Sequence, residues 1–510
     1  MHPLAKLDHR FIWHPFTQMR DWLKREPILI TKGRGALLQD AHGRQYLDAN
    51  SSIWTNLHGH NHPKINKALA QQLRNIAHSS ALGLANQPAS LLAGRLVRAA
   101  NAKQGPSGKG RRYAAPAPRR LAKVFFSDDG STAIEVALKL AYEIARRTHG
   151  NKNPRFLSLG GGYHGDTIGA VSLGHIDRFH KAYSRLLFKT DYTMAPYCYR
   201  CPFNRAKPER ADARLYRQCH WECLDQLERK VAIRKKKGAP YAGFVFEPLM
   251  QGAAGMIPQP EGWLGRAAQI ARSHGALLIA DEVMTGFGRT GFGAQTPATG
   301  GNRSDLQPHG IRPELRHLAS RPEPILFATC KEGVRPDFLA MAKGLTGGYL
   351  PMAATLATQG VFDAFLGEYE EFKTFFHGHS FTGNQLGAAA ALANLDLLES
   401  PGCASSAMRL ERALAEELKD LWALPNVGDI RQTGLIAGVE LVKDWRTRQP
   451  FQPGERAAIR VCETMAKRGV LTRPVGDVVV LMPPYCMTRA QLQKTVAALA
   501  DAISISKRAL

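Results

Sequence analysis

The chain has 510 residues, of which 44% are hydrophobic and 22% are charged. These proportions are ordinary for a folded protein and argue against a mainly disordered chain, and the length favours two domains over one small core. The net charge is +25. Because no aromatic ladder interleaves the basic residues, we interpret the charge as a solvated surface and expect no nucleic-acid partner.

The sequence also predicts neither a membrane-spanning helix nor a signal peptide. A membrane helix needs about 18 or more consecutive apolar residues, and no apolar run of that length occurs. The opening residues 1–20 mix His, Lys, Asp and Arg with apolar residues, so they lack the apolar centre of a signal peptide. We therefore expect a cytoplasmic protein.

Short apolar runs alternate with amphipathic runs from about residue 120 to residue 350. This alternation predicts an α/β fold with a mainly parallel sheet that helices cover on both faces. Ligands of such sheets bind at the carboxyl ends of the strands, so we expect a site near Ser127, Glu247 and Asp281. The predicted elements are strands at 28–31, 36–39, 122–127, 155–159, 243–247 and 276–281 and helices at 131–146 and 263–274.

The pattern changes after residue 398 and predicts a second, smaller α+β domain. We expect helices at 407–421 and 489–505 and strands at 435–442 and 478–482. The predicted division is a large domain at 61–398 and a small domain made of 1–60 and 399–510. Basic segments, two of them rich in Gly and Pro, are expected to be loop insertions at about 101–120, 196–223 and 295–324.

Lys343 and Asp281 are the first candidates for chemistry. Lys343 lies between apolar residues and glycines in LAMAKGLTGG, where burial would lower its pKa and make it a good imine former, although a surface lysine is the plain alternative. Asp281 ends an apolar strand in LLIADEV. A buried carboxylate needs a cation there, and the protonated ring nitrogen of pyridoxal phosphate would serve, although a helix cap is an alternative.

Two further segments have small or aromatic residues between a strand and a helix. Asp129-Gly130-Ser131-Thr132 could present backbone N–H groups to a phosphate at the start of a helix, or could simply cap that helix. Tyr163, in GGYHGDT, could stack on a cofactor ring, although a lone loop tyrosine is more often merely packed.

The combination is far more specific than its members. In order, the chain carries SDDGSTAIE, GGYHGDT, FEPLMQGAAGM, ADEVMTGFGRTG, AKGLTGGYLP and HGHSFTGNQLGAAAAL. This series resembles the class III (ω-amino-acid type) aminotransferases, from about Phe11 to about Pro484. The resemblance implies a fold-type-I transferase that depends on pyridoxal phosphate.

Segments near both ends narrow the resemblance. IWHPFTQM, NSSIW, TRP and LMPPY are similar to the branch of the family that converts 8-amino-7-oxononanoate to 7,8-diaminononanoate in biotin synthesis. The branches that act on ornithine or 4-aminobutyrate are the alternative.

The resemblance also implies a role for each matching residue. Lys343 would hold the cofactor as an imine and move the substrate proton, Asp281 would pair with the ring nitrogen, and Tyr163 would stack on the ring and touch the substrate. A homodimer with a shared site is implied, because the phosphate would also meet Ser380 of the second subunit. The further implied residues are Gly130, Ser131 and His379 for the cofactor and Phe16, Trp54, Gly378 and Arg473 for the substrate.

Two departures from the family pattern affect the substrate pocket. Phe16 stands where many members have tyrosine, and the lost hydroxyl removes a hydrogen bond worth about 0.5–1.5 kcal/mol. The amino donor therefore stays open between S-adenosylmethionine and L-lysine. Ile53 stands where some members have a second tryptophan.

Four of the eight cysteines are clustered with the spacing C-x2-C-x17-C-x3-C, namely Cys198, Cys201, Cys219 and Cys223. This spacing approaches that of a zinc ribbon. Reduced loop cysteines are the interpretation we favour, so we predict no metal, and amino transfer needs none.

Overall fold

The computed structural model describes residues 1–102, 119–150, 153–293 and 324–508. The insertions predicted at about 101–120 and 295–324 therefore lie almost entirely outside the described residues. The segment predicted as a third insertion, 196–223, lies within them and contains the short helices η2 (Cys198–Arg200) and α9 (Ala213–Tyr216).

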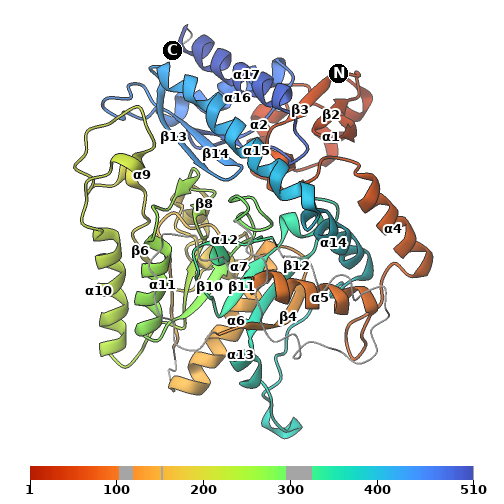
Figure 1. Cartoon of the computed structure of the whole chain (residues 1–510), viewed down its shortest axis with the longest axis vertical. Helices are drawn as coiled ribbons and strands as arrows, with labels where there is room; N and C mark the ends of the chain where they lie inside the picture. The colour runs from red at the N-terminus through yellow and green to blue at the C-terminus, as the bar shows by residue number, and fades with distance from the viewer. Residues whose placement is uncertain (103–118, 151–152, 294–323, 509–510) are drawn as a thin grey trace.

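A seven-stranded sheet forms the centre of the molecule (Figure 1). Among the described residues all of its neighbouring strands pair in parallel except at β12, which is antiparallel to both neighbours. The predicted α/β class with a mainly parallel sheet is confirmed. The strands, in spatial order, are β4 (Leu121–Ser127), β12 (Ala353–Thr358), β11 (Phe338–Met341), β10 (Leu277–Asp281), β7 (Gly243–Phe246), β5 (Phe156–Leu159) and β6 (Asp191–Thr193).

Helices cover both faces of this sheet, which explains why inner strands such as β7 and β11 are apolar and buried along their whole length. On one face α6 (Gly130–His149) packs on Ile279 and Phe338. On the other face α10 (Glu222–Lys236) and α11 (Trp263–Ser273) pack on neighbouring side chains that point the opposite way, such as Leu278. Within the described ranges no helix is long and apolar enough to cross a membrane.

The C-terminal part and the first strands of the chain lie together beside the central sheet (Figure 1). The strand β15 (Val470–Leu471) pairs in parallel with β3 (Gln45–Asp48), so one sheet combines strands from the N-terminal and the C-terminal parts of the chain. That sheet also includes β1 (Ile30–Arg34) and β2 (Leu37–Asp40), and a second sheet contains β13 (Val427–Thr433), β14 (Ile436–Leu441), β17 (Val478–Leu481) and β16 (Pro474–Val475).

The remaining α-helices and strands connect or cover these sheets. They are α1 (Pro3–Phe11), α2 (Met19–Trp22), α3 (Ser51–Trp54), α4 (Pro63–Asn75), α5 (Gln87–Ala100), α7 (Ile168–Ser172), α8 (Asp177–His180), β8 (Met250–Gln251), β9 (Ile257–Pro258), α12 (Ala328–Lys331), α13 (Gln359–Asp363), α14 (Gln385–Leu398), α15 (Pro401–Leu418), α16 (Ala457–Lys467) and α17 (Arg489–Arg508).

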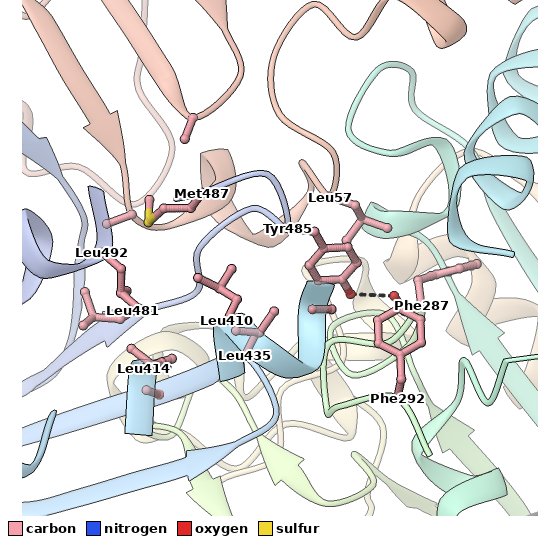
Figure 2. Packing of buried hydrophobic residues seen from close by; sticks show 14 of the residues in the cluster. Leu57, Phe287, Phe292, Leu410, Leu414, Leu435, Leu481, Tyr485, Met487 and Leu492 are labelled. Carbon is pink, nitrogen blue, oxygen red and sulfur yellow. Dashed lines mark hydrogen bonds between the residues drawn. The ribbon is translucent and has the colours of Figure 1, made fainter. Parts of the chain in front are cut away.

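One buried cluster joins the two parts of the molecule (Figure 2). Tyr485, from the C-terminal part, donates a hydrogen bond from its hydroxyl to the carbonyl oxygen of Phe287 at 2.6 Å. Phe292 lies edge-on to the same tyrosine ring, 5.8 Å between centroids, and Leu57 belongs to the same cluster. The loop that follows β10 is therefore fixed against both ends of the chain.

Candidate active site

A pocket of about 530 Å³ lies at the carboxyl ends of the central strands. Its volume is within the usual range for a small-molecule site, and its position is the one where ligands bind in open α/β sheets. Eight of the residues singled out in the sequence line it together: Trp54, Asp129, Gly130, Ser131, Tyr163, Glu247, Asp281 and Lys343.

Lys343 follows β11 and begins the short helix η5 (Lys343–Thr346). Burial lowers the pKa of its ammonium group, so a larger share of the side chain is a neutral amine near pH 7. Its Nζ lies 4.8 Å from the centroid of the Trp54 ring. The turn that begins at Lys343 is held by Asn394, whose side-chain amide donates to the carbonyl oxygens of Gly344 and Leu345 at 2.9 and 3.0 Å.

Asp281 lies on the floor of the pocket with two other buried titratable groups. Its Oδ2 shares a 2.7 Å hydrogen bond with Nδ1 of His164, and its Oδ1 accepts from the backbone N–H of Val283 at 3.1 Å. Burial disfavours the charge of His164, but the hydrogen bond to Asp281 and the negative charges of Asp281 and Glu247 raise its pKa overall. Burial raises the pKa of Glu247 to about 7.

The start of α6 forms another wall. Asp129 caps the helix by accepting from the N–H of Thr132 at 2.9 Å. Gly130 and Ser131 follow at the positive end of a 20-residue helix, where backbone N–H groups are free to meet an anion. Gly165 must be glycine, because a Cβ at that position would lie 2.0 Å from the Ser131 Oγ.

Tyr163 and Phe16 form the outer part of the site. The Tyr163 hydroxyl donates to Asp166 at 2.8 Å. The Phe16 ring lies edge-on to the Tyr163 ring at 6.5 Å, yet Phe16 is 57% exposed. Arg473 is half-buried, and its charge interacts with both Tyr163 and Lys343. Phe16 and Arg473 therefore lie beside the lined pocket, not in its wall.

Three residues singled out in the sequence lie on the segment 378–380. Gly378 and Ser380 are exposed and do not line this chain's pocket. His379 reaches the rim, where its Nδ1 lies 2.9 Å from the Asp128 Oδ2, and Asp128 lines the pocket.

The structure also shows pocket residues to which the sequence assigned no role. His164 is the most informative, because it stands next to Tyr163 in the motif and its contact with Asp281 was not visible in the sequence. Val283 and Met284, two and three residues after Asp281, line the same space. The periodicity of apolar and polar residues gave no indication that either of these two residues would face the pocket.

The eight cysteines are free thiols. Throughout the part of the chain that the structure describes, no three His, Cys, Asp or Glu side chains are grouped so that they could hold a metal ion.

The family description Aminotransferase class-III matches residues 19–306 and 325–503. The chain therefore belongs to the class III aminotransferases.

Among its relatives is the adenosylmethionine-8-amino-7-oxononanoate aminotransferase of Geobacter sulfurreducens, 45% identical over 98% of this chain and 97% of that protein. A solved structure of the enzyme of that name from Methanocaldococcus jannaschii has a TM-score of 0.81 and 35% identity, and the match covers 98% of each chain.

This membership makes the chain a pyridoxal-phosphate-dependent aminotransferase. A similar solved structure is a PLP-bound amine transaminase from an uncultivated Pseudomonas species, with a TM-score of 0.78 and 32% identity over 97% of this chain and 98% of that one. The pocket fits the cofactor, because it offers a half-buried lysine, a buried carboxylate and a helix N-terminus lined by glycine, including Gly165, which admits no side chain.

Proposed function

We propose that this chain aminates 8-amino-7-oxononanoate to 7,8-diaminononanoate in biotin synthesis. The observation that carries the proposal is the 45% identity to a relative of that name over nearly the full length of both proteins. The pocket supports it, because the amine of Lys343 interacts with the carboxylates of Asp281 and Glu247 and lies beside the Trp54 ring. A class III enzyme for ornithine or 4-aminobutyrate is the alternative.

We propose that Lys343 moves the proton in this reaction. Bound pyridoxal phosphate supplies the electron sink that amino transfer needs. Burial lowers the pKa of Lys343, so its Nζ can take a proton from the substrate carbon and return it. The Trp54 ring, whose centroid lies 4.8 Å from that nitrogen, would shield the Lys343 Nζ from water on the side where the ring lies.

Asp281, Gly130 and Ser131 are proposed to orient the cofactor. Asp281 would pair with the ring nitrogen, and its hydrogen bond to His164 fixes the carboxylate in place. Gly130 and Ser131 would hold the phosphate at the start of α6. Tyr163 would lie against the ring and the substrate.

The substrate would lie between Trp54 and Arg473. Its carbon chain is apolar and suits the Trp54 ring, whereas its carboxylate suits the planar guanidinium of Arg473. Burial lowers the pKa of that guanidinium, but its charge is kept because arginine starts far above neutral pH. Phe16 and Gly378 would complete the entrance.

We further propose a homodimer in which Ser380 of the partner subunit completes the phosphate site and His379 supports it. Ser380 and Gly378 are exposed and lie outside the pocket of their own chain. Large apolar side chains near them and on another segment are also exposed, which is typical of an interface: Leu82 at 91%, Leu84 at 62%, Phe376 at 73% and Phe381 at 56%.

The division of the chain also stays a proposal. We retain a large domain at 61–398 and a small one made of 1–60 and 399–510. The parallel pairing of β15 with β3 supports it, because it places residues from both parts of the small domain in one sheet.

An acceptor and donor panel tests the proposed function. The purified enzyme is given 8-amino-7-oxononanoate with S-adenosylmethionine, with L-lysine or with neither, and 7,8-diaminononanoate is measured. We expect diamine with S-adenosylmethionine, the donor that the names of the relatives give. Formation of the diamine only with L-lysine would identify lysine as the amino donor. Turnover of ornithine or 4-aminobutyrate, with no turnover of 8-amino-7-oxononanoate, would overturn the proposal.

A further inference from the structure

The segment Ser51–Trp54 has an unusual backbone. All four residues have positive φ angles, 47, 46, 63 and 74°, so the chain makes one left-handed turn. Side chains disfavour this conformation, because Cβ meets the following carbonyl oxygen, and glycine is the residue that normally adopts it. None of the four is glycine, and Ile53 is β-branched, for which such a φ is rare. Something must hold the turn.

The Asp48 side chain makes hydrogen bonds to this turn. Its carboxylate is buried, with 3% of the residue exposed. Oδ1 accepts from the backbone N–H of Ser52 at 3.0 Å and of Asn50 at 3.3 Å, and Oδ2 accepts from the Ser52 hydroxyl at 2.8 Å. Two hydrogen bonds therefore join Asp48 to Ser52, in the middle of the left-handed turn.

A second contact orients the Asp48 carboxylate. Oδ2 lies 2.9 Å from the His60 Nε2. The amide nitrogen of Asn56 lies 2.9 Å from the His60 Nδ1, and this nitrogen can only donate, so the ring proton is on Nε2 and points at Asp48. Asp48 also ends β3, where it pairs with Leu471 of β15. The clamp is thus built on a sheet that is itself tied to the C-terminal part.

The turn carries Trp54 into the pocket. The indole is 8% exposed and lines the cavity. Its Nε1 donates to the Asn50 Oδ1 at 2.8 Å, and its ring lies 4.8 Å from the Lys343 Nζ. In a relaxed, right-handed backbone the side chain of Trp54 would leave from a different direction, because the hand of the turn fixes the direction of each Cβ.

We propose that Asp48 is a positioning residue: it holds the left-handed turn and so sets the distance between Trp54 and Lys343 and the width of the pocket for the acceptor chain. This role rests on the proposed function, because the acceptor named there is the molecule whose fit would change. It assigns no chemistry to Asp48, which does not line the pocket.

A double-mutant cycle on the holoenzyme tests the proposal. Asp48→Asn keeps the shape of the side chain but removes its charge and two of its accepting lone pairs. We expect kcat/KM for 8-amino-7-oxononanoate to fall by about tenfold or more, mainly through KM, since hydrogen bonds to a charged group are the stronger ones. The cofactor absorbance band is expected to stay. In a Trp54→Ala background the same change should cost less than about twofold, because coupled residues are not additive.

Two further variants keep the result interpretable. Ile53→Gly removes the Cβ that the left-handed backbone disfavours, so in the Asp48→Asn enzyme it should restore most of the lost kcat/KM. Asp40→Asn is the matched control: Asp40 is also buried, at 2% exposure, in the same sheet, but it bonds Arg44 and Tyr46. It should leave KM unchanged.

Equal losses from Asp48→Asn in the wild-type and Trp54→Ala backgrounds would overturn the proposal, as would an Asp48→Asn enzyme with unchanged KM. Failure of the proposed function is separate, because it would show in the wild type as no turnover of this acceptor. The same cycle would then be measured with whichever acceptor the wild type uses.

Discussion

The pocket has two walls that are built in different ways. The sheet wall carries Asp281, Glu247 and Lys343, each at or just after the carboxyl end of a regular strand. The wall formed by residues 48–60 carries Trp54 on a left-handed turn held by Asp48. The first wall supplies titratable groups and the second supplies shape, which suggests that chemistry and substrate fit can be altered separately.

The largest expected effect is on the sheet wall. Lys343→Ala removes the group that we propose moves the substrate proton, so we expect amino transfer to fall by at least about 10²–10⁴-fold and the cofactor absorbance band to disappear. Turnover rates measure the loss of amino transfer, and the visible absorbance spectrum measures the loss of the cofactor band. A variant that kept both its band and its turnover would show that another lysine does this work.

Asp281→Asn should come next. It keeps the shape of the side chain but removes the negative charge that we propose pairs with the cofactor ring nitrogen, and loss of one such electrostatic contact typically costs about 10²–10³-fold in rate. Asp337→Asn is the control, because Asp337 is equally buried but precedes β11 at the opposite end of the sheet and bonds Arg119. Equal losses in kcat for both variants would contradict the role of Asp281.

A smaller effect follows from Glu247. Its pKa is raised to about 7 from 4.5, so Glu247 holds its proton in the folded protein at pH values where the unfolded chain has released it. This difference lowers the free energy of unfolding: the loss is absent below about pH 4.5, grows as the pH rises toward 7 and is constant above that. In cofactor-free protein, Glu247→Gln should thus gain stability over the wild type, by up to about 3 kcal/mol, as the pH rises from 5 to 7.5.

Urea unfolding at several pH values measures this difference. An offset between the two proteins that does not change with pH would mean that Glu247 ionises normally in the fold.

The sheet wall is also the part that the sequence predicted best. Apolar strands ending in Ser127, Glu247 and Asp281 indicated where a site should lie, because strand periodicity and the rule for parallel sheets are local properties of a sequence. The strands β11 and β12 received no such prediction, although both are buried along their whole length. A short apolar run next to a glycine-rich segment gives no clear period.

The resemblance pointed to Trp54 in the other wall, but the backbone that carries it could not be predicted. Ser51-Ser52-Ile53-Trp54 contains no glycine or asparagine, so nothing local signals positive φ angles. The turn depends on Asp48, on Met482, whose carbonyl accepts from the Ser51 hydroxyl at 2.7 Å, and on packing between both ends of the chain. Contacts between residues more than 400 positions apart leave no trace in local periodicity.

The smallest effect we predict tests how firmly this second wall is fixed. Arg289 is buried and donates to the carbonyl oxygens of Asn56 and Pro483, each at 2.8 Å. Arg289→Met would leave both carbonyls without a donor, for which we expect a loss of about 2 kcal/mol in the free energy of unfolding. Denaturation with urea measures it, and no loss would show that the segment is held without Arg289.

The most direct test of the account is to locate the lysine that holds pyridoxal phosphate. Borohydride reduces the bond between a lysine and the cofactor, and digestion followed by mass spectrometry then identifies the labelled peptide. We expect the label on Lys343, with none in Lys343→Ala. A label on another lysine, such as the half-buried Lys331, or no label in protein saturated with cofactor, would contradict this assignment.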